Sequence, residues 1–372
     1  MSRKVVVTGA NGFVGTHVVR RLAERADVTV APLTRGTPDA AVRTALASAD
    51  AVLHLAGENR PSDPAHYETG NVDFTARILG LLREGGHRPR IVFSSSIQAA
   101  LDNPYGVSKR AAEELLAAYA RETGSDVRVL RLANVFGKWT RPEYNSAVAT
   151  FANAIARGLP YQVHDRARKV RLVHIDAVVD ALLTSALGPP RGAGLHRDEA
   201  GPVVEQSLGA IVDLLESFRE SRVTRILPDM SESFTRLLYS VYVSYLPADA
   251  VEYALQQHSD ARGTLAEVLK SPQFGQIFLS RTKPGITRGN HWHHTKTEKF
   301  VVVEGQAVIR FRAISHDESF QIRVDGSDFR VVDIPPGYAH SITNVGRGEL
   351  VTLFWASEPF DPAQPDTFPL EA

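Results

Sequence analysis

Residues 4–15 read KVVVTGANGFVG, and this stretch decides the fold of the first two thirds of the chain. Its β-branched residues predict a short buried strand, and three glycines follow where that strand must turn into a helix. Gly9 permits the tight turn, Gly12 lets a pyrophosphate approach backbone N–H groups, and Gly15 lets the helix pack against its strand. The helix then directs its positive end at the phosphates. The residues expected to contact a dinucleotide here are Gly9, Asn11, Gly12, Phe13, Val14 and Gly15.

Composition limits the classes of protein that the chain can form. With 372 residues, 43% of them hydrophobic, it can bury a large core, and we expect two domains. Basic and acidic residues balance at 42 each, so the chain has no overall field to attract nucleic acid or an anionic membrane. The absence of cysteine excludes disulfides and thiolate metal sites. Since we find neither a signal-like leader nor an apolar run long enough to cross a bilayer, we expect a cytoplasmic protein.

The second predicted strand, 28–33, ends in Leu33-Thr34-Arg35. In dinucleotide-binding folds this strand end meets the adenosine ribose, where an acid favours NAD and a basic residue accommodates a 2′-phosphate. Because the end carries no acid and does carry an arginine, we expect NADPH rather than NADH, with Arg35 pairing the phosphate. An exposed surface arginine without a ligand is the alternative.

Tyr105 and Lys109 lie four residues apart in a helix that we predict from Asn103 through Ala120, so both project from one face. An ammonium close to a phenol favours the phenolate and lowers the pKa, which makes Tyr105 a candidate proton donor to a carbonyl undergoing reduction. A serine hydroxyl at the end of the preceding strand, 90–94, can hydrogen-bond the same oxygen. This set predicts a reductase site.

From about residue 260 the pattern changes to short alternating strands, as expected for an antiparallel all-β domain. His291 and His293 are two residues apart on a strand and share a face, and we expect Glu298 and His340 on adjoining strands. Three imidazole nitrogens and one carboxylate oxygen suit zinc or another divalent transition metal, in a catalytic or a structural role. Leu246-Pro247 is the boundary signal, so we expect domains at 1–246 and 247–372.

Several motifs in the first domain resemble the extended short-chain dehydrogenase/reductase family. They are the glycine spacing, HLAG at 54–57, NPYGVSK at 103–109 and RLANVFG at 131–137. The resemblance implies an α/β fold, with a Rossmann-like doubly wound parallel sheet. It also implies that Ser96, with Ser95 second, assists Tyr105, and that Lys109 holds the ribose. Further residues gain roles from the same resemblance: Leu55, Ala56 and Gly57 beside the cofactor, Asn134 toward the sugar nucleotide, and Arg166 and Arg171 as a clamp on a UDP pyrophosphate.

The C-terminal motifs resemble the cupin family, a double-stranded β-helix. Across almost the whole length, stretches such as KPGITRGNHWHHTKTEKF at 283–300 and FDPAQPDT at 360–367 look like a family of bifunctional capsule and O-antigen enzymes. This resemblance implies a UDP-linked 4-keto sugar as substrate, C3 epimerisation by the cupin, and C4 reduction with NADPH. The product would be UDP-2-acetamido-2,6-dideoxy-L-talose, on the way to UDP-N-acetyl-L-fucosamine. It further implies a homodimer. The epimerase base stays open among Lys296, Tyr338 and His294.

Three alternatives belong to other classes. A sugar-nucleotide 4,6-dehydratase usually carries an Asp-Glu pair after the serine, where this chain has Ile97-Gln98. A non-catalytic NADPH and sugar sensor often loses the tyrosine or the lysine, and both are present here. In the third alternative the cupin is structural and only dimerises the chain.

Overall fold

The computed structural model describes residues 2–372, which divide into two compact units. The first unit runs to Leu215 and includes Arg236–Leu246. The second comprises Glu216–Thr235 and Pro247–Ala372. The functional division at 246 and 247 stays a prediction, because compactness does not test which activity each part carries. Among residues 2–372, no helix is both long and apolar enough to cross a membrane.

The first unit is built on a parallel sheet of six strands in the order β2-β1-β3-β4-β5-β8, which confirms the predicted doubly wound α/β fold. The strands are β1 (Arg3–Thr8), β2 (Val28–Leu33), β3 (Ala51–His54), β4 (Arg90–Ser96), β5 (Asp126–Leu132) and β8 (Gly194–Glu199). The helices are α1 (Phe13–Ala23), α2 (Asp39–Leu46), α3 (Ala65–Tyr67), α4 (Phe74–Gly85), α5 (Pro104–Thr123), α6 (Ala147–Arg157) and α7 (Ile175–Leu187).

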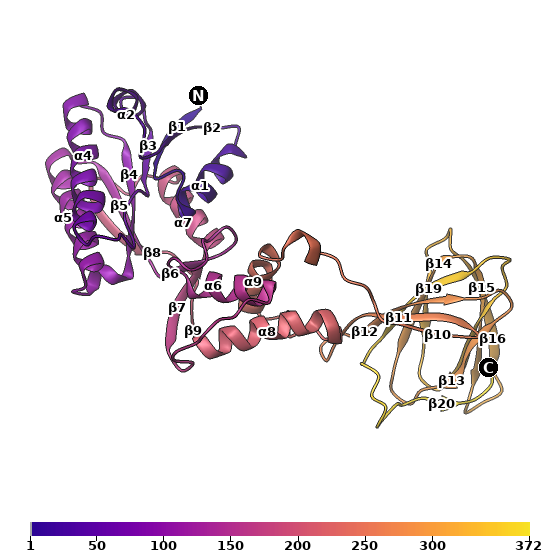
Figure 1. Cartoon of the computed structure of the whole chain (residues 1–372). Helices are drawn as coiled ribbons and strands as arrows, with labels where there is room; N and C mark the ends of the chain where they lie inside the picture. Colours follow the sequence, from indigo (N-terminus) through magenta and orange to yellow (C-terminus); the bar gives the residue numbers. More distant parts are fainter. Residues whose placement is uncertain (1) are drawn as a thin grey trace. The chain divides into compact units, whose positions relative to one another are not determined.

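Alternation of side chains along the buried strands separates two cores. Val5 and Val7 of β1 face the core that α1 and α7 complete, whereas Val6 faces the core shared with α2, α4 and α5. Both faces of the sheet are therefore covered, with α4 and α5 on one side and α1 and α7 on the other (Figure 1). This arrangement leaves the carboxyl edge of the strands as the place for ligands.

Shorter elements complete the first unit. A second small sheet has the order β6-β7-β9, from β6 (Asn134–Phe136), β7 (Lys169–His174) and β9 (Val203–Ser207). The π-helix η1 (Glu68–Asp73) precedes α4, and the 3₁₀ helix η2 (Ile97–Ala100) follows β4. Of the other helices, α8 (Leu208–Thr224) and α9 (Ser233–Ser244) each have residues in both units, and the 3₁₀ turn η3 (Ala248–Ala250) belongs to the second unit.

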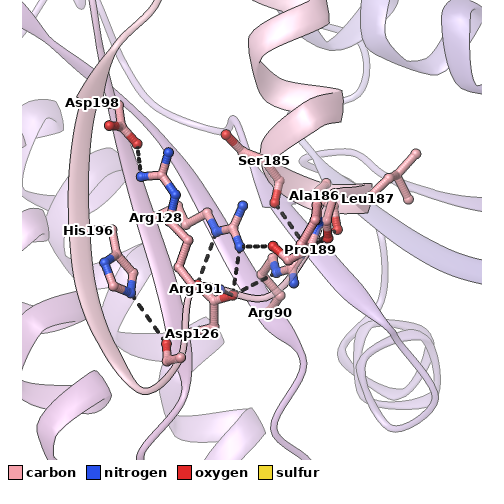
Figure 2. A network of polar contacts seen from close by, with 12 residues as sticks. Arg90, Asp126, Arg128, Ser185, Ala186, Leu187, Pro189, Arg191, His196 and Asp198 are labelled. Carbon is pink, nitrogen blue, oxygen red and sulfur yellow. Dashed lines mark hydrogen bonds and ion pairs between the residues drawn. The ribbon is translucent and has the colours of Figure 1, made fainter.

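A buried charge network fixes the amino ends of β4 and β5 at the edge of the sheet opposite the ligand edge (Figure 2). Arg90 and Arg128 each hold Asp126 at 2.9 Å. Arg90 Nη1 also donates to carbonyl oxygens at the C-terminus of α7, those of Ser185, Ala186 and the C-cap residue Gly188, at 3.2, 2.9 and 2.8 Å. A guanidinium at a helix C-terminus satisfies these otherwise unpaired oxygens and complements the helix dipole.

The part of the second unit that follows Pro247 contains two antiparallel sheets, which confirms the predicted all-β region. Their orders are β10-β11-β12-β19-β14-β17 and β16-β15-β18-β13-β20. The strands are β10 (Gln257–Asp260), β11 (Gly263–Ser271), β12 (Gly275–Thr282), β13 (Thr287–Trp292), β14 (Glu298–Glu304), β15 (Gln306–Ala313), β16 (Ser319–Asp325), β17 (Val331–Ile334), β18 (Tyr338–Asn344), β19 (Leu350–Ala356) and β20 (Phe368–Pro369). Inward side chains of both sheets, such as Phe300, Phe311 and Ile342, form one core.

Candidate active sites

The turn after β1 has the shape that its glycines predict. Gly9 has φ +68°, and a Cβ there would lie 2.7 Å from the backbone nitrogen of Ala56. A Cβ at Gly15 would lie 2.1 Å from the backbone oxygen of Gly9, so only glycine allows this close packing of α1 on the turn. Gly12 is the N-cap of α1 and offers no side chain to the first free amides of the helix. Those amides are available for a phosphate. Asn11 lies exposed in the turn, and Phe13 and Val14 start the helix.

The segment after β3 is held against this turn by Thr8. Its hydroxyl accepts hydrogen bonds from the backbone nitrogens of Leu55 and Ala56 at 3.1 and 3.2 Å, and it lies 2.8 Å from His54 Nδ1. His54 is fully buried, and burial lowers its pKa to about 3, so it is a neutral structural residue. A Cβ at Gly57 would lie 3.2 Å from Lys109 Nζ. The glycine therefore lets residues 55–57 lie close to Lys109 of α5.

Tyr105 and Lys109 come from the first two turns of α5, whose N-cap Asn103 accepts a hydrogen bond from the Gly106 nitrogen at 2.8 Å. Ser96, at the end of β4, is near enough to the Tyr105 phenol to lower its pKa. Lys109 Nζ donates to the backbone oxygen of Ser94 at 2.9 Å. The structure thus brings the three predicted catalytic residues together at the carboxyl edge of the sheet.

The protonation state of Tyr105 differs from the expectation. Burial raises the pKa of its phenol to about 12, although the Ser96 hydrogen bond lowers it. The prediction that Lys109 lowers this pKa is wrong, because the ammonium turns to the Ser94 carbonyl and burial dominates. Burial lowers the pKa of Lys109 to about 8, whereas the charge of Glu113 raises it. Tyr105 therefore keeps its proton at neutral pH, which is the form that a proton donor requires.

Ser95 is turned away from this group. Its hydroxyl donates to Glu113 at 2.6 Å, and Glu113 is buried and also paired with Arg131 and Arg197 at 2.8 and 3.2 Å. Ser96, which we favoured over Ser95 as the serine that assists Tyr105, is the one near the Tyr105 phenol. Sequence reasoning missed Glu113. The available signal was its position four residues after Lys109, on the same face of α5.

The predicted ligand-binding cations all have carboxylate partners. Arg35 is highly exposed and is paired with Glu58. Arg171 lies 3.0 Å from Glu199, and Arg166 is paired with Asp213. Asn134 Nδ2 donates to the backbone oxygen of Arg171 at 2.8 Å, so Asn134 and Arg171 are neighbours.

The four predicted metal ligands form one cluster in the second unit. The four candidate ligand atoms of His291, His293, Glu298 and His340 all lie within 4.8 Å of one another. Glu298 Oε2 lies 3.5 Å from His293 Nε2 and 3.2 Å from His340 Nε2. Two ligand atoms about 2.0–2.1 Å from a tetrahedral zinc ion lie roughly 3.3 Å apart, which matches this spacing. Within residues 2–372, His293 Nε2, Glu298 Oε2 and His340 Nε2 are buried and have no hydrogen-bond partner. The residues therefore fit a divalent metal ion.

The strands that carry these ligands differ in two details from the expectation. Glu298 and His340 are not on adjoining strands, because β14 and β18 belong to different sheets. The two side chains meet across the interior between the sheets. His293 lies one residue beyond the end of β13, after a register shift between Gly289 and His291, so strand alternation alone does not explain why it faces His291.

The residues left open as epimerase bases have other partners. Lys296 is buried and donates from Nζ to the Pro365 backbone oxygen at 2.8 Å. Tyr338 donates its hydroxyl hydrogen to Glu318 at 2.9 Å. His294 is exposed and packs its ring on Phe368.

Comparison with known proteins agrees with this architecture. The family described as the NAD dependent epimerase/dehydratase family matches residues 5–193, and the polysaccharide biosynthesis C-terminal domain matches residues 258–368. The chain belongs to the NAD dependent epimerase/dehydratase family. A curated family relative is UDP-2-acetamido-2,6-beta-L-arabino-hexul-4-ose reductase of Pseudomonas aeruginosa, which is 42% identical over 98% of both chains.

Two solved structures are similar to the chain. The capsular polysaccharide assembling protein CapF from Staphylococcus aureus is 44% identical, with a TM-score of 0.90 over 99% of this chain and all of that chain. MoeE5, solved in complex with UDP-glucose and NAD, is 27% identical with a TM-score of 0.51 over 57% of this chain and 80% of that one. The CapF match includes both units, whereas MoeE5 covers little more than half of the chain.

Proposed function

We propose that the protein reduces the C4 ketone of a UDP-linked 4-keto-6-deoxy-2-acetamido sugar with NADPH, after its C-terminal unit has epimerised C3. The product would be UDP-2-acetamido-2,6-dideoxy-L-talose, a precursor for capsular or O-antigen polysaccharide. The observation that carries the reduction is the meeting of Ser96, Tyr105 and Lys109 at the ligand edge of the sheet. The full-length likeness to a named hexul-4-ose reductase supports the choice of substrate.

In the reductase site, bound NADPH supplies the hydride that reaches C4. Tyr105, protonated at neutral pH, gives its proton to the developing alkoxide oxygen, and the Ser96 hydroxyl donates a hydrogen bond to the same oxygen. We assign the ribose to Lys109, whose ammonium is fixed on the Ser94 carbonyl. We assign the 2′-phosphate to Arg35, which must leave or share Glu58 to bind it.

We place the sugar nucleotide against Asn134, Arg166 and Arg171. The two arginines have exposed carboxylate partners, and an exposed ion pair is weak enough for a pyrophosphate to displace it. The side-chain amide of Asn134 neighbours Arg171, and we assign it a contact with the same sugar nucleotide.

We further propose that the second unit is a cupin, and that zinc or another divalent transition metal is held by His291, His293, Glu298 and His340. A C3 proton is acidic only because C4 is a ketone, so the epimerising site must stabilise an enolate and move a proton. A divalent ion held there supplies Lewis acidity toward a carbonyl oxygen. The buried unpaired atoms of three of the four residues support this assignment. We also propose that the chain acts as a homodimer, which sedimentation equilibrium tests.

The proposal is tested by incubating the protein with the UDP-4-keto sugar, with and without NADPH, and identifying products by NMR. We expect one reduced product, inverted at C3, and NADPH consumption equal to the sugar reduced. Because C6 of this sugar already lacks a hydroxyl, the dehydratase alternative is tested separately with the corresponding UDP-N-acetylhexosamine, and loss of water from that sugar without net consumption of NADPH would support it. Binding of NADPH and sugar without turnover would leave the sensor alternative and contradict the proposal.

A further inference from the structure

The C-terminal segment, residues 360–370, lies along the part of the second unit that carries the metal ligands. Strand β20 pairs with β13, so that Pro369 faces His291 and Phe368 faces Trp292. The rings of Trp292 and Phe368 have centroids 5.0 Å apart. Residues far apart in the sequence therefore meet directly beside the cluster of His291, His293, Glu298 and His340.

The carboxylate of Asp366 holds the loop that joins two of these ligands, His293 and Glu298. It accepts hydrogen bonds from the backbone nitrogens of His294, Thr295 and Lys296 at 2.9, 3.0 and 2.9 Å, and from Thr295 Oγ1 at 3.2 Å. The backbone nitrogen of Thr297, the last residue of the loop, donates to Ser357 Oγ at 3.1 Å. All four backbone N–H groups between the two ligands thus have fixed acceptors, and one carboxylate supplies three of them.

The same residue also orients His293. Its backbone oxygen lies 2.5 Å from His293 Nδ1. Because a carbonyl oxygen only accepts, the proton of the neutral imidazole sits on Nδ1, and the lone pair of Nε2 is left for a metal. Nε2 is the atom that lies 3.5 Å from Glu298 Oε2 and has no hydrogen-bond partner among residues 2–372. Lys296 strengthens the attachment by donating from Nζ to Pro365 at 2.8 Å.

We propose that Asp366 is a positioning residue of the metal centre: its carboxylate fixes the 294–296 loop and its backbone oxygen sets the His293 tautomer. The inference rests on the proposed metal site and adds a role for the C-terminal segment. Mutation of a residue that hydrogen-bonds to a metal-ligating histidine and orients it typically lowers metal affinity by about 10–100-fold. We expect a change of that size in an Asp366→Ala chain, since the loop loses the acceptor for three N–H groups.

The test measures zinc affinity of the full chain by competition with a chromophoric chelator, and the visible spectrum of the Co²⁺-substituted chain. The variants are Asp366→Ala, Asp366→Asn and the control Asp361→Ala. Asp361 belongs to the same segment and is exposed, and its carboxylate accepts a local bond from the Ala363 nitrogen at 2.9 Å. We expect zinc affinity to fall about 10–100-fold in Asp366→Ala with a changed cobalt spectrum, and to stay at the wild-type value in Asp361→Ala.

Asp366→Asn keeps the shape of the side chain but loses one acceptor oxygen, so we expect a smaller loss of zinc affinity in the same direction. Unchanged zinc affinity and cobalt spectrum in folded Asp366→Ala would overturn the inference. If Asp366→Ala does not fold, an unchanged Asp366→Asn chain overturns it instead. A wild-type chain that binds no zinc, or a His340→Ala chain that binds it as tightly as wild type, would instead contradict the proposed metal site itself.

Discussion

Lys109 Nζ donates a 2.9 Å hydrogen bond to the backbone oxygen of Ser94, two residues before Ser96 on β4. This bond joins α5 to the end of the strand that carries Ser96. The backbone of Gly57 lies close to the same ammonium, because a Cβ there would be 3.2 Å from Nζ. The protein itself thus fixes the Lys109 ammonium between the end of β4 and the segment that follows β3.

Replacing Tyr105 by phenylalanine removes the proton donor and leaves the ring. We expect the rate of NADPH oxidation with the UDP-4-keto sugar to fall about 10²–10⁴-fold, the usual contribution of a general acid. NADPH binding, measured by fluorescence titration, should stay near the wild-type value. A Tyr105→Phe protein with the wild-type rate would contradict the assigned role.

The pH dependence of reduction should follow Lys109. Because burial lowers its pKa to about 8, the ammonium is present below that pH and is lost above it, so kcat/KM should decline as pH rises through about 8. The phenol of Tyr105, with a pKa of about 12, stays protonated throughout this range. The charge of Glu113 raises the Lys109 pKa, so Glu113→Gln should move the alkaline decline to lower pH. An unmoved profile in that variant would show that Glu113 does not act on Lys109.

Arg35 should decide between the two nicotinamide cofactors. We expect Arg35→Ala to raise the KM for NADPH about 10–100-fold, the value of a charge-assisted hydrogen bond, and to leave the KM for NADH nearly unchanged. Steady-state kinetics with both cofactors checks this, with Arg121→Ala, an exposed arginine in the last turn of α5, as the matched control. An equal effect on both cofactors would contradict the 2′-phosphate assignment.

The charge network at the other edge of the sheet should govern stability. Asp126 has a side chain only 13% exposed and neutralises Arg128, which is 4% exposed. Asp126→Ala leaves buried cations unpaired, and we expect the free energy of unfolding to fall by about 3–5 kcal/mol. Asp198→Ala removes the more exposed partner of Arg191 and should cost about 0–1 kcal/mol. Urea unfolding of both variants measures the difference between their free energies of unfolding. Equal unfolding midpoints would contradict a stabilising role for Asp126.

The sequence predicted those features that depend on local spacing. The glycine turn, the strand and helix order, and the gathering of Tyr105, Lys109 and Ser96 follow from short motifs, since a parallel sheet collects its strand ends at one edge. The four metal-ligand candidates also met as expected. The functional roles of these residues remain predictions.

Features that depend on packing between distant segments were not predictable in the same way. The pKa of Tyr105 is set by burial, which the four-residue spacing to Lys109 does not report. The placement of Glu298 and His340 on different sheets depends on how the strands pair. Asp366 lies 68 residues beyond Glu298 (366 minus 298) in the sequence, and no spacing rule connects it to the loop it holds.

We propose that one ketosugar is the substrate of both units, a claim that solvent-deuterium incorporation at C3 can decide. The UDP-4-keto sugar is incubated in D₂O without NADPH, and C3 is followed by NMR with the wild-type, Tyr105→Phe and His291→Ala chains. We predict deuterium at C3 with wild type and with Tyr105→Phe, which has lost reduction, and none with His291→Ala. Absence of deuterium from the wild-type reaction, or full incorporation by His291→Ala, would contradict the claim.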